Sequence, residues 1–188
     1  GKTKLAKALA ASMEADFARI QFTPDLLPGD VTGMNVYNRK TEEFELHKGP
    51  AFTNILLADE INRATPKTQS ALLEAMQEHT VTVGNETYAL AEPFMVLATQ
   101  NPIEQEGTYP LPEAQTDRFM LKVVIGYPKK EEEMQIIRQN ILGKTPEVAP
   151  ILSIDEIIKA REIVHSVYLD EKIEKYIHCI GCGSCRSL

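Results

Sequence analysis

The sequence predicts an α/β fold in which helices cover a parallel β-sheet. Residues 55–58 are four consecutive apolar residues, a pattern typical of a strand that is buried on both faces. Two acidic residues, Asp59 and Glu60, follow at the end of this strand, where open α/β sheets bind their ligands. A second apolar run, residues 94–98, also ends in polar residues. We therefore expect the candidate site at this edge of the sheet.

The paired acids suit nucleotide hydrolysis. Asp59 and Glu60 alternate in direction, so that one faces a metal ion and the other a water molecule. Hydrolysis of a nucleotide uses one carboxylate near Mg²⁺ and a second that polarises the attacking water. A buried strand that ends in a solvated acidic turn is an equally good interpretation of this stretch by itself.

The first three residues favour the nucleotide hypothesis. Gly1, Lys2 and Thr3 match the end of G-x-x-x-x-G-K-[ST], a loop whose backbone N–H groups bind phosphates. Lys2 is expected to reach the outer phosphates of ATP, and the Thr3 hydroxyl is expected to bind Mg²⁺. The tripeptide alone recurs by chance, but a helix and then the strand ending in Asp-Glu follow it. We expect the chain to begin inside this loop, and residues 1–188 to bind ATP poorly without its first positions.

Composition agrees with an intracellular, cytoplasmic enzyme domain. The 188 residues are 43% apolar and contain no apolar run long enough for a membrane span. The net charge is −7, and the sequence contains no cluster of basic residues of consequence. Both observations argue against nucleic acid as the main partner. All three cysteines lie in the last ten residues, so no disulfide framework is expected to hold the fold.

Apolar spacing and turn residues predict the order of elements. Two helices are expected, at residues 2–14 and from Pro66, after a Thr65 N-cap, to about 79. The segment 23–33 is either a surface loop or a helix interrupted by an insertion. The predicted strands cover residues 17–22, 55–58, 94–98 and 121–125, with β-hairpins at 36–46 and 81–90, and with Phe119 and Leu121 in the core.

Two further polar residues are candidates for the site. Asn101 follows the strand at 94–98 and is expected to hydrogen-bond the attacking water or the terminal phosphate; its alternative role is that of a turn residue before proline. Arg118 is either the partner of a local ion pair with Asp117 or Glu113, or an arginine finger that reaches a neighbouring subunit's nucleotide.

The composition changes after residues 126–128, Gly-Tyr-Pro, which form a natural hinge. Helices are expected at 129–142, 153–167 and 170–178, with a capping box that starts at Ser153. The expected domains are an α/β core at residues 1–127 and a small helical domain at residues 128–188.

Taken together, these motifs resemble those of MoxR-type AAA+ ATPases over residues 1 to about 178. Five phrases carry the resemblance: Asp-Leu-Leu-Pro-Gly-Asp-Val-Thr-Gly at 25–33, Lys-Gly-Pro-Ala-Phe at 48–52, Leu-Ala-Asp-Glu-Ile-Asn-Arg-Ala at 57–64, Ala-Thr-Gln-Asn-Pro at 98–102 and Leu-Pro-Glu-Ala-Gln-Thr-Asp-Arg-Phe at 111–119. The resemblance implies a P-loop AAA+ core with a helical lid, ATP and Mg²⁺ as cofactors, and homo-oligomeric rings that are usually hexameric.

The resemblance also implies a chaperone-like role in the maturation of other proteins, often with a von Willebrand factor A partner. It assigns the residues as follows: Gly1, Lys2 and Thr3 to Walker A, Asp59 and Glu60 to Walker B, Asn101 to sensor 1, Arg118 to the arginine finger, and residues 36–46 to an insertion within helix 2.

The C-terminus departs from the family pattern. A second sensor arginine usually lies within Gly-Ala-Ser-Pro-Arg, of which Ser184 and Arg186 resemble remnants, so Arg186 is assigned to nucleotide binding. Cys179, Cys182 and Cys185 instead resemble the first three ligands of a ferredoxin-type iron–sulfur site, without its fourth cysteine. A shortened lid, a chimeric end and a truncated cluster domain are the alternatives.

Three function classes follow from these motifs. The leading hypothesis is an ATPase that remodels partner proteins. The alternative is a nucleotide-responsive scaffold or inactive fragment, suggested by the incomplete phosphate loop and the irregular lid. An electron-transfer module is the third. Phosphate release from ATP separates the first two hypotheses, and a visible absorption band after anaerobic reconstitution would support the third.

Overall fold

The computed structural model describes residues 2–101, 107–142 and 148–182 of the chain. The chain divides into two compact units, Gly1–Ser153 and Ile154–Leu188. The expected division between a core at residues 1–127 and a lid at residues 128–188 stays a prediction. No helix in the described ranges is long and apolar enough to cross a membrane.

The first unit is built on a three-stranded parallel sheet. Its central strand is β4 (Ile55–Asp59), which pairs with β1 (Phe17–Gln21) on one side and with β7 (Met95–Ala98) on the other. The first four side chains of β4 are all at most 1% exposed. This burial on both faces confirms the buried parallel strand that the sequence predicts.

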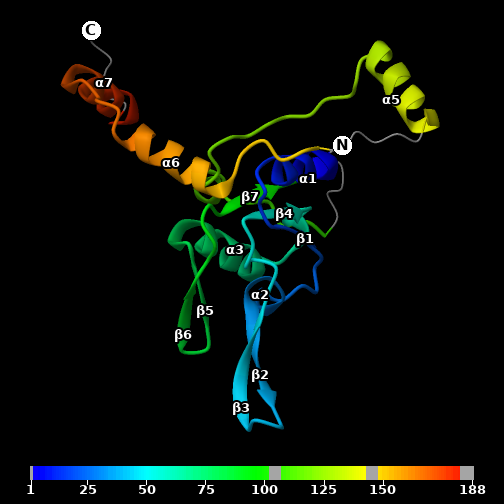
Figure 1. The fold of residues 1–188 in the computed structure, drawn as a ribbon, viewed down its shortest axis with the longest axis vertical. Coiled ribbons are helices and arrows are strands. Elements are labelled where there is room, and N and C mark those ends of the chain that lie inside the picture. Colours follow the sequence, from blue (N-terminus) through cyan, green and yellow to red (C-terminus); the bar gives the residue numbers. More distant parts are fainter. Residues whose placement is uncertain (1, 102–106, 143–147, 183–188) are drawn as a thin grey trace. The chain divides into compact units, whose positions relative to one another are not determined.

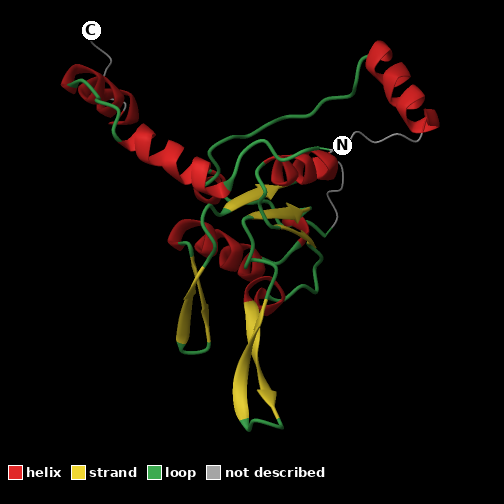
Figure 2. Cartoon of the chain, in the orientation of Figure 1, coloured by secondary structure: helices red, strands yellow, loops and turns green. Residues whose placement is uncertain are grey.

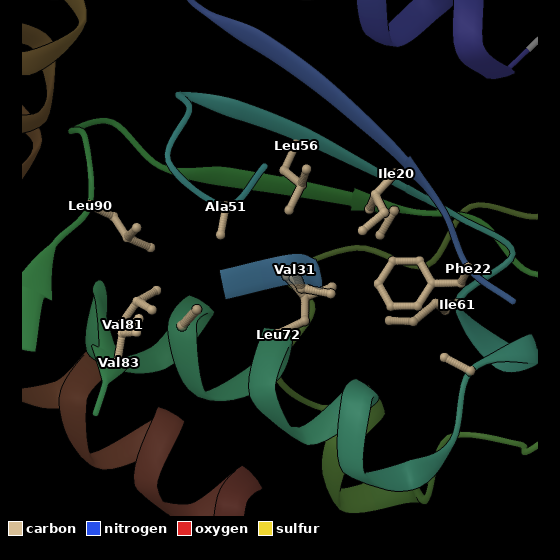
Figure 3. Packing of buried hydrophobic residues seen from close by; sticks show 13 residues of the cluster. Ile20, Phe22, Val31, Ala51, Leu56, Ile61, Leu72, Val81, Val83 and Leu90 are labelled. Carbon is tan, nitrogen blue, oxygen red and sulfur yellow. The ribbon is translucent and has the colours of Figure 1, made fainter. Parts of the chain in front are cut away.

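One face of the sheet packs on the main core. Leu56 and Ala58 of β4 join Ile20 of β1 and Leu72 of α3 (Pro66–Glu78) in a single buried apolar cluster (Figure 3). Leu56 and Ala58 share this face because alternate side chains of a strand point the same way. The cluster fixes the register of β4 and with it the position of the acids at its end.

Helix α1 (Lys2–Ser12) covers the other face of the sheet. Its small residues Ala6 and Ala10, one helical turn apart, are each 2% exposed and let the helix lie close to β4. Figure 1 shows α1 and α3 on opposite sides of the sheet. The layers are therefore helix, sheet and helix, with α1 starting at the end of the sheet where β4 stops.

Helix α3 begins and ends close to the predicted residues. Pro66 takes its first position, and His79 ends it in the left-handed conformation with φ 53°. The predicted N-cap differs, since the Thr65 side chain makes no capping bond and its hydroxyl lies 3.3 Å from that of Thr68. Between β4 and α3 the chain forms a single 3₁₀ turn, Ile61–Arg63.

Two antiparallel hairpins extend from the first unit (Figure 2). The first consists of β2 (Gly33–Asn38) and β3 (Glu43–Lys48), and the second of β5 (Thr80–Val83) and β6 (Glu86–Ala89). Both hairpins are as predicted. Segment 23–33, which the sequence left open between a loop and an interrupted helix, contains the short helix α2 (Pro28–Thr32).

The predicted strand at residues 121–125 is wrong. This segment has no regular secondary structure, and Leu121 and Val124 are 78% and 85% exposed. Phe119 is half-buried, so only it approaches the predicted core position. The sheet of the described residues ends at β7, and an apolar segment becomes a strand only where a neighbouring strand offers backbone partners.

The remaining helices are α4 (Glu113–Thr116) and α5 (Lys130–Leu142) in the first unit, and α6 (Ile154–His165) and α7 (Glu171–Cys182) in the second. Helix α7 continues past the predicted end at residue 178. An i,i+4 ion pair on its exposed surface joins Lys175 to Glu171 at 2.7 Å.

Candidate functional site

The site is formed where the carboxyl ends of β4 and β7 meet. In the parallel pairing of the two strands, Ala58 is opposite Ala98. Backbone hydrogen bonds continue beyond this pair: Thr99 N–H donates to Ala58 O at 2.9 Å, and Ile61 N–H donates to Thr99 O at 3.0 Å. Two segments about forty residues apart in sequence are thereby held side by side, and the polar residues after each strand are brought together as predicted.

The carboxylate of Asp59 is held by hydrogen bonds at both oxygens. The hydroxyl of Thr99 donates to Oδ1 at 2.5 Å. Arg19, on the neighbouring strand β1, donates to Oδ2 from Nη2 at 2.7 Å and from Nε at 3.2 Å. The side chain of Asp59 is 17% exposed. These contacts leave Asp59 a defined orientation at the mouth of the site.

Glu60 leaves the strand in the left-handed conformation, with φ 57° and ψ 48°. This backbone conformation is uncommon for a residue other than glycine, and such residues cluster at functional sites. Glu60 N–H donates to Thr99 Oγ1 at 2.9 Å. Its Oε2 accepts hydrogen bonds from Gln21 Nε2 at 3.0 Å and from Arg63 Nη1 at 3.2 Å. The two carboxylates therefore have different side-chain partners, although Thr99 also contacts the backbone of Glu60.

A hollow of about 330 Å³ opens at these strand ends. It is lined by six polar residues: Thr3, Asp59, Glu60, Thr99, Gln100 and Asn101. Thr3 lies in the first turn of α1, where backbone N–H groups have no partner within the helix and favour an anion. The structure thus brings together four of the residues that the sequence nominates.

The residues present fit a phosphate group with a Mg²⁺ ion. Mg²⁺ prefers oxygen ligands and is usually bound by one or two carboxylates together with substrate phosphates. The hydroxyl of Thr3 and the carboxylate of Asp59 line the same hollow, beside the N-terminus of α1. No group of three or more His, Cys, Asp or Glu suited to hold a metal by itself occurs in the described part of the chain.

Some predicted site residues lie elsewhere. Arg118 is exposed after α4 and does not line the hollow. Within the described ranges it makes no ion pair with Asp117 or Glu113, although its backbone N–H donates to Gln115 O at 3.4 Å. Its predicted role in another subunit's site stays a prediction.

Other predictions fall on residues that the structure leaves undescribed. Gly1, Cys185 and Arg186 lie outside the described residues, and Lys2 is described only as the first residue of α1. The iron–sulfur and second-sensor hypotheses for the C-terminus accordingly stay hypotheses.

The sequence analysis did not single out three residues of the site: Arg19, Gln21 and Thr99. Arg19 and Gln21 occupy alternate positions of β1 and therefore share a face of the sheet. Two polar residues at this spacing in a short, otherwise apolar strand were the available signal. This spacing identifies Arg19 and Gln21 as site residues only once β1 is known to pair with β4.

A helix-covered parallel sheet, with an acidic pair at its central strand end and a Lys-Thr helix start beside it, defines the AAA+ P-loop ATPase fold. Residues 1–121 match the model of the ATPase family associated with various cellular activities (AAA). The chain belongs to this family, as a MoxR-type member.

Similar proteins agree with this assignment. The chain is 54% identical over 178 residues to the uncharacterized protein YeaC of Bacillus subtilis, covering 94% of this chain and 56% of the relative. It is 48% identical over 177 residues to the chaperone MoxR1 of Mycobacterium tuberculosis, covering 94% and 46%.

A crystal structure of a proposed ATPase from Cytophaga hutchinsonii is also similar, with a TM-score of 0.82 and 50% identity. That similarity covers 94% of this chain and 55% of the other. The chain spans about half the length of these relatives.

Proposed function

We propose that this protein binds ATP with Mg²⁺ and hydrolyses it. The observation that carries the proposal is the shared hollow, which places Thr3, Asp59, Glu60 and Asn101 around one space. The family match supports an ATPase-type function. An acidic pair next to a helix N-terminus is the arrangement that a bound phosphate chain and its cation require.

Thr3 and Asp59 are proposed to hold the cation, and Lys2 and the start of α1 to hold the phosphates. Asp59 lies beside Thr3 in the lining of the hollow, and its Oδ1 is oriented by the Thr99 hydroxyl. Bound Mg²⁺ supplies charge stabilisation as phosphoryl transfer proceeds. The backbone N–H groups of the first turn of α1 supply fixed positive partial charge on the same side.

Glu60 is proposed as the general base. Gln21 and Arg63 fix its Oε2, which sets the direction of the carboxylate and leaves Oε1 for a water molecule. As the water oxygen bonds to the γ-phosphorus, the bond to the β,γ-bridging oxygen breaks, ADP departs and the water proton passes to Glu60. Asn101, which lines the same hollow, is proposed to hydrogen-bond the same water or the γ-phosphate.

The work driven by hydrolysis is proposed to be chaperone-like remodelling of partner proteins. A relative that is 48% identical is named as a chaperone. A homo-oligomeric ring, most simply a hexamer in the cytoplasm, with a von Willebrand factor A partner, is proposed on the family resemblance. Arg118 is exposed in this chain, as a residue that completes a neighbouring site must be.

The proposal is tested on the loop-complete protein, by which we mean this protein with Gly-x-x-x-x preceding Gly1. We expect Mg²⁺-dependent release of phosphate from ATP. Calorimetric binding of ATP without phosphate release would contradict hydrolysis and support a nucleotide-responsive scaffold instead. Absence of both binding and release would contradict the proposal entirely.

A further inference from the structure

We propose that Arg19 is the counter-ion of Asp59 and makes cation binding at the acidic pair depend on nucleotide. In this proposal the positive charge of the guanidinium repels a divalent cation that arrives without nucleotide. Mg²⁺ therefore binds well only together with the phosphates of ATP. Arg19 is thus a positioning residue that acts through Asp59. The inference rests on the proposed role of Asp59 as a cation ligand.

Strand pairing places Arg19 beside Asp59. Arg19 is opposite Leu57 in the β1–β4 register, and Gln21 is opposite Asp59. Because Leu57 and Asp59 are two residues apart, they share a face of β4, and Arg19 and Gln21 share the corresponding face of β1. An arginine at this position reaches diagonally to the carboxylate at the strand end.

The contact between Arg19 and Asp59 has a defined hydrogen-bond geometry. Two N–H groups of Arg19 converge on the same Oδ2, at 2.7 Å and 3.2 Å, and Nη2 also donates to Gln21 Oε1 at 2.9 Å. The guanidinium is planar and its donors have a fixed geometry, so these three bonds set its orientation. Gln21 in turn donates to Glu60, which links the guanidinium to the second acid.

Each acid of the pair has its own arginine. Arg19 pairs with Asp59 at 2.7 Å and Arg63 pairs with Glu60 at 3.2 Å. Two adjacent carboxylates would attract a divalent cation strongly, but two guanidinium groups at these distances offset most of their charge. The side chain of Arg19 is 45% exposed, so water and salt screen part of this effect.

The geometry leaves a route for the cation when nucleotide is present. Arg19 donates to Oδ2, whereas the Thr99 hydroxyl donates to Oδ1, so the guanidinium and the hydroxyl contact different oxygens of the carboxylate. A cation that arrives with phosphate oxygens takes most of its ligands from them and from water, and it needs few from Asp59. A bare cation lacks the phosphate charge and meets the guanidinium beside the same carboxylate.

The test measures binding of Mn²⁺, used as the probe for Mg²⁺, to the loop-complete protein by electron paramagnetic resonance. Arg19→Gln removes the charge but keeps an N–H donor, and Arg19→Lys keeps the charge. Arg39→Gln is the matched control, because Arg39 is an exposed arginine in the turn between β2 and β3. Circular dichroism checks that each variant is folded.

Without nucleotide, we expect Arg19→Gln to bind Mn²⁺ about two- to fivefold more tightly than the wild type, the scale of a partly exposed ion pair. Arg19→Lys and Arg39→Gln should stay close to the wild type. Adding Asp59→Asn to Arg19→Gln should abolish the gain. With a non-hydrolysable ATP analogue, the difference between Arg19→Gln and the wild type should become smaller.

Equal Mn²⁺ affinity of Arg19→Gln and Arg39→Gln would overturn the proposal, as would a gain that survives Asp59→Asn. These outcomes differ from failure of the proposed function. If the protein released no phosphate while Arg19→Gln still gained affinity through Asp59, the ATPase proposal would fall and the counter-ion proposal would stand.

Discussion

The hydroxyl of Thr99 donates a hydrogen bond to Asp59 Oδ1 across two neighbouring parallel strands. The same hydroxyl accepts the backbone N–H of Glu60 at 2.9 Å. One small side chain therefore sets both the carboxylate of the first acid and the backbone of the second. The single hydroxyl proton is committed to Asp59, which leaves Thr99 no proton to donate to substrate.

Replacement of Thr99 by valine, which keeps the shape and removes the hydroxyl, should destabilise the protein by about 1–3 kcal/mol, because the Glu60 N–H loses its partner. Urea unfolding measures the change. Thr87→Val is the matched control, since Thr87 makes an exposed hydroxyl contact with Thr82 on the second hairpin. Equal loss at positions 99 and 87 would contradict a special role for Thr99.

Glu60→Gln in the loop-complete protein should keep ATP binding and lose hydrolysis. The amide cannot accept the water proton, and loss of a general base usually lowers the rate by about 10²–10⁴-fold. Calorimetry measures binding and phosphate release measures turnover. If binding and turnover fell by the same factor, Glu60 would be a nucleotide ligand and the general-base assignment would be wrong.

The first hairpin gives a test of backbone geometry. Gly33 has φ 97° and ψ 172°, a region open essentially only to glycine, and a Cβ there would meet His47 O and lie 2.7 Å from Gly49 N. Gly33→Ala should lower the free energy of unfolding by about 1–3 kcal/mol or more. Gly126→Ala, where a Cβ meets nothing within 4 Å, should change it little.

What the sequence predicted correctly depends on local pattern. The apolar run before Asp59 and the polar end after β7 are each visible within ten residues, and parallel strands bring their carboxyl ends to one edge. The contact between Arg19 and Asp59 was not predictable in this way, because it spans forty residues. It depends on which strands pair and in which register, and neither is a property of either strand alone.

At residues 121–125 the local sequence pattern predicted a strand that the structure does not contain. The apolar, β-branched residues of this segment favour a strand, yet strand formation also requires backbone partners along one edge. Among the described residues, none pairs with it, and Val124 is 85% exposed. Local propensity was therefore an insufficient guide where the neighbouring strand decides the outcome.

Arg118 is predicted to act in the site of a neighbouring subunit. It is exposed after the short helix α4 and lies outside the lining of the hollow. Arg63, which follows the acidic pair and could also reach a subunit interface, is instead paired with Glu60 of its own chain at 3.2 Å. In the loop-complete protein, Arg118→Ala should keep ATP binding and ring assembly while hydrolysis falls by up to about 10³-fold, because charge developing on the γ-phosphate loses its partner. Arg39→Ala, an exposed arginine on the first hairpin, is the control and should stay active.

Mixing separates action in trans from action in cis. An Arg118→Ala subunit keeps an intact Glu60, and a Glu60→Gln subunit keeps an intact Arg118, so a mixed ring contains interfaces where both groups are present. Rings assembled from the two inactive variants should recover part of the phosphate release, with their composition verified by native mass spectrometry. If verified mixed rings stay as inactive as either variant alone, Arg118 does not complete a neighbour's site, and an effect within its own subunit explains the loss.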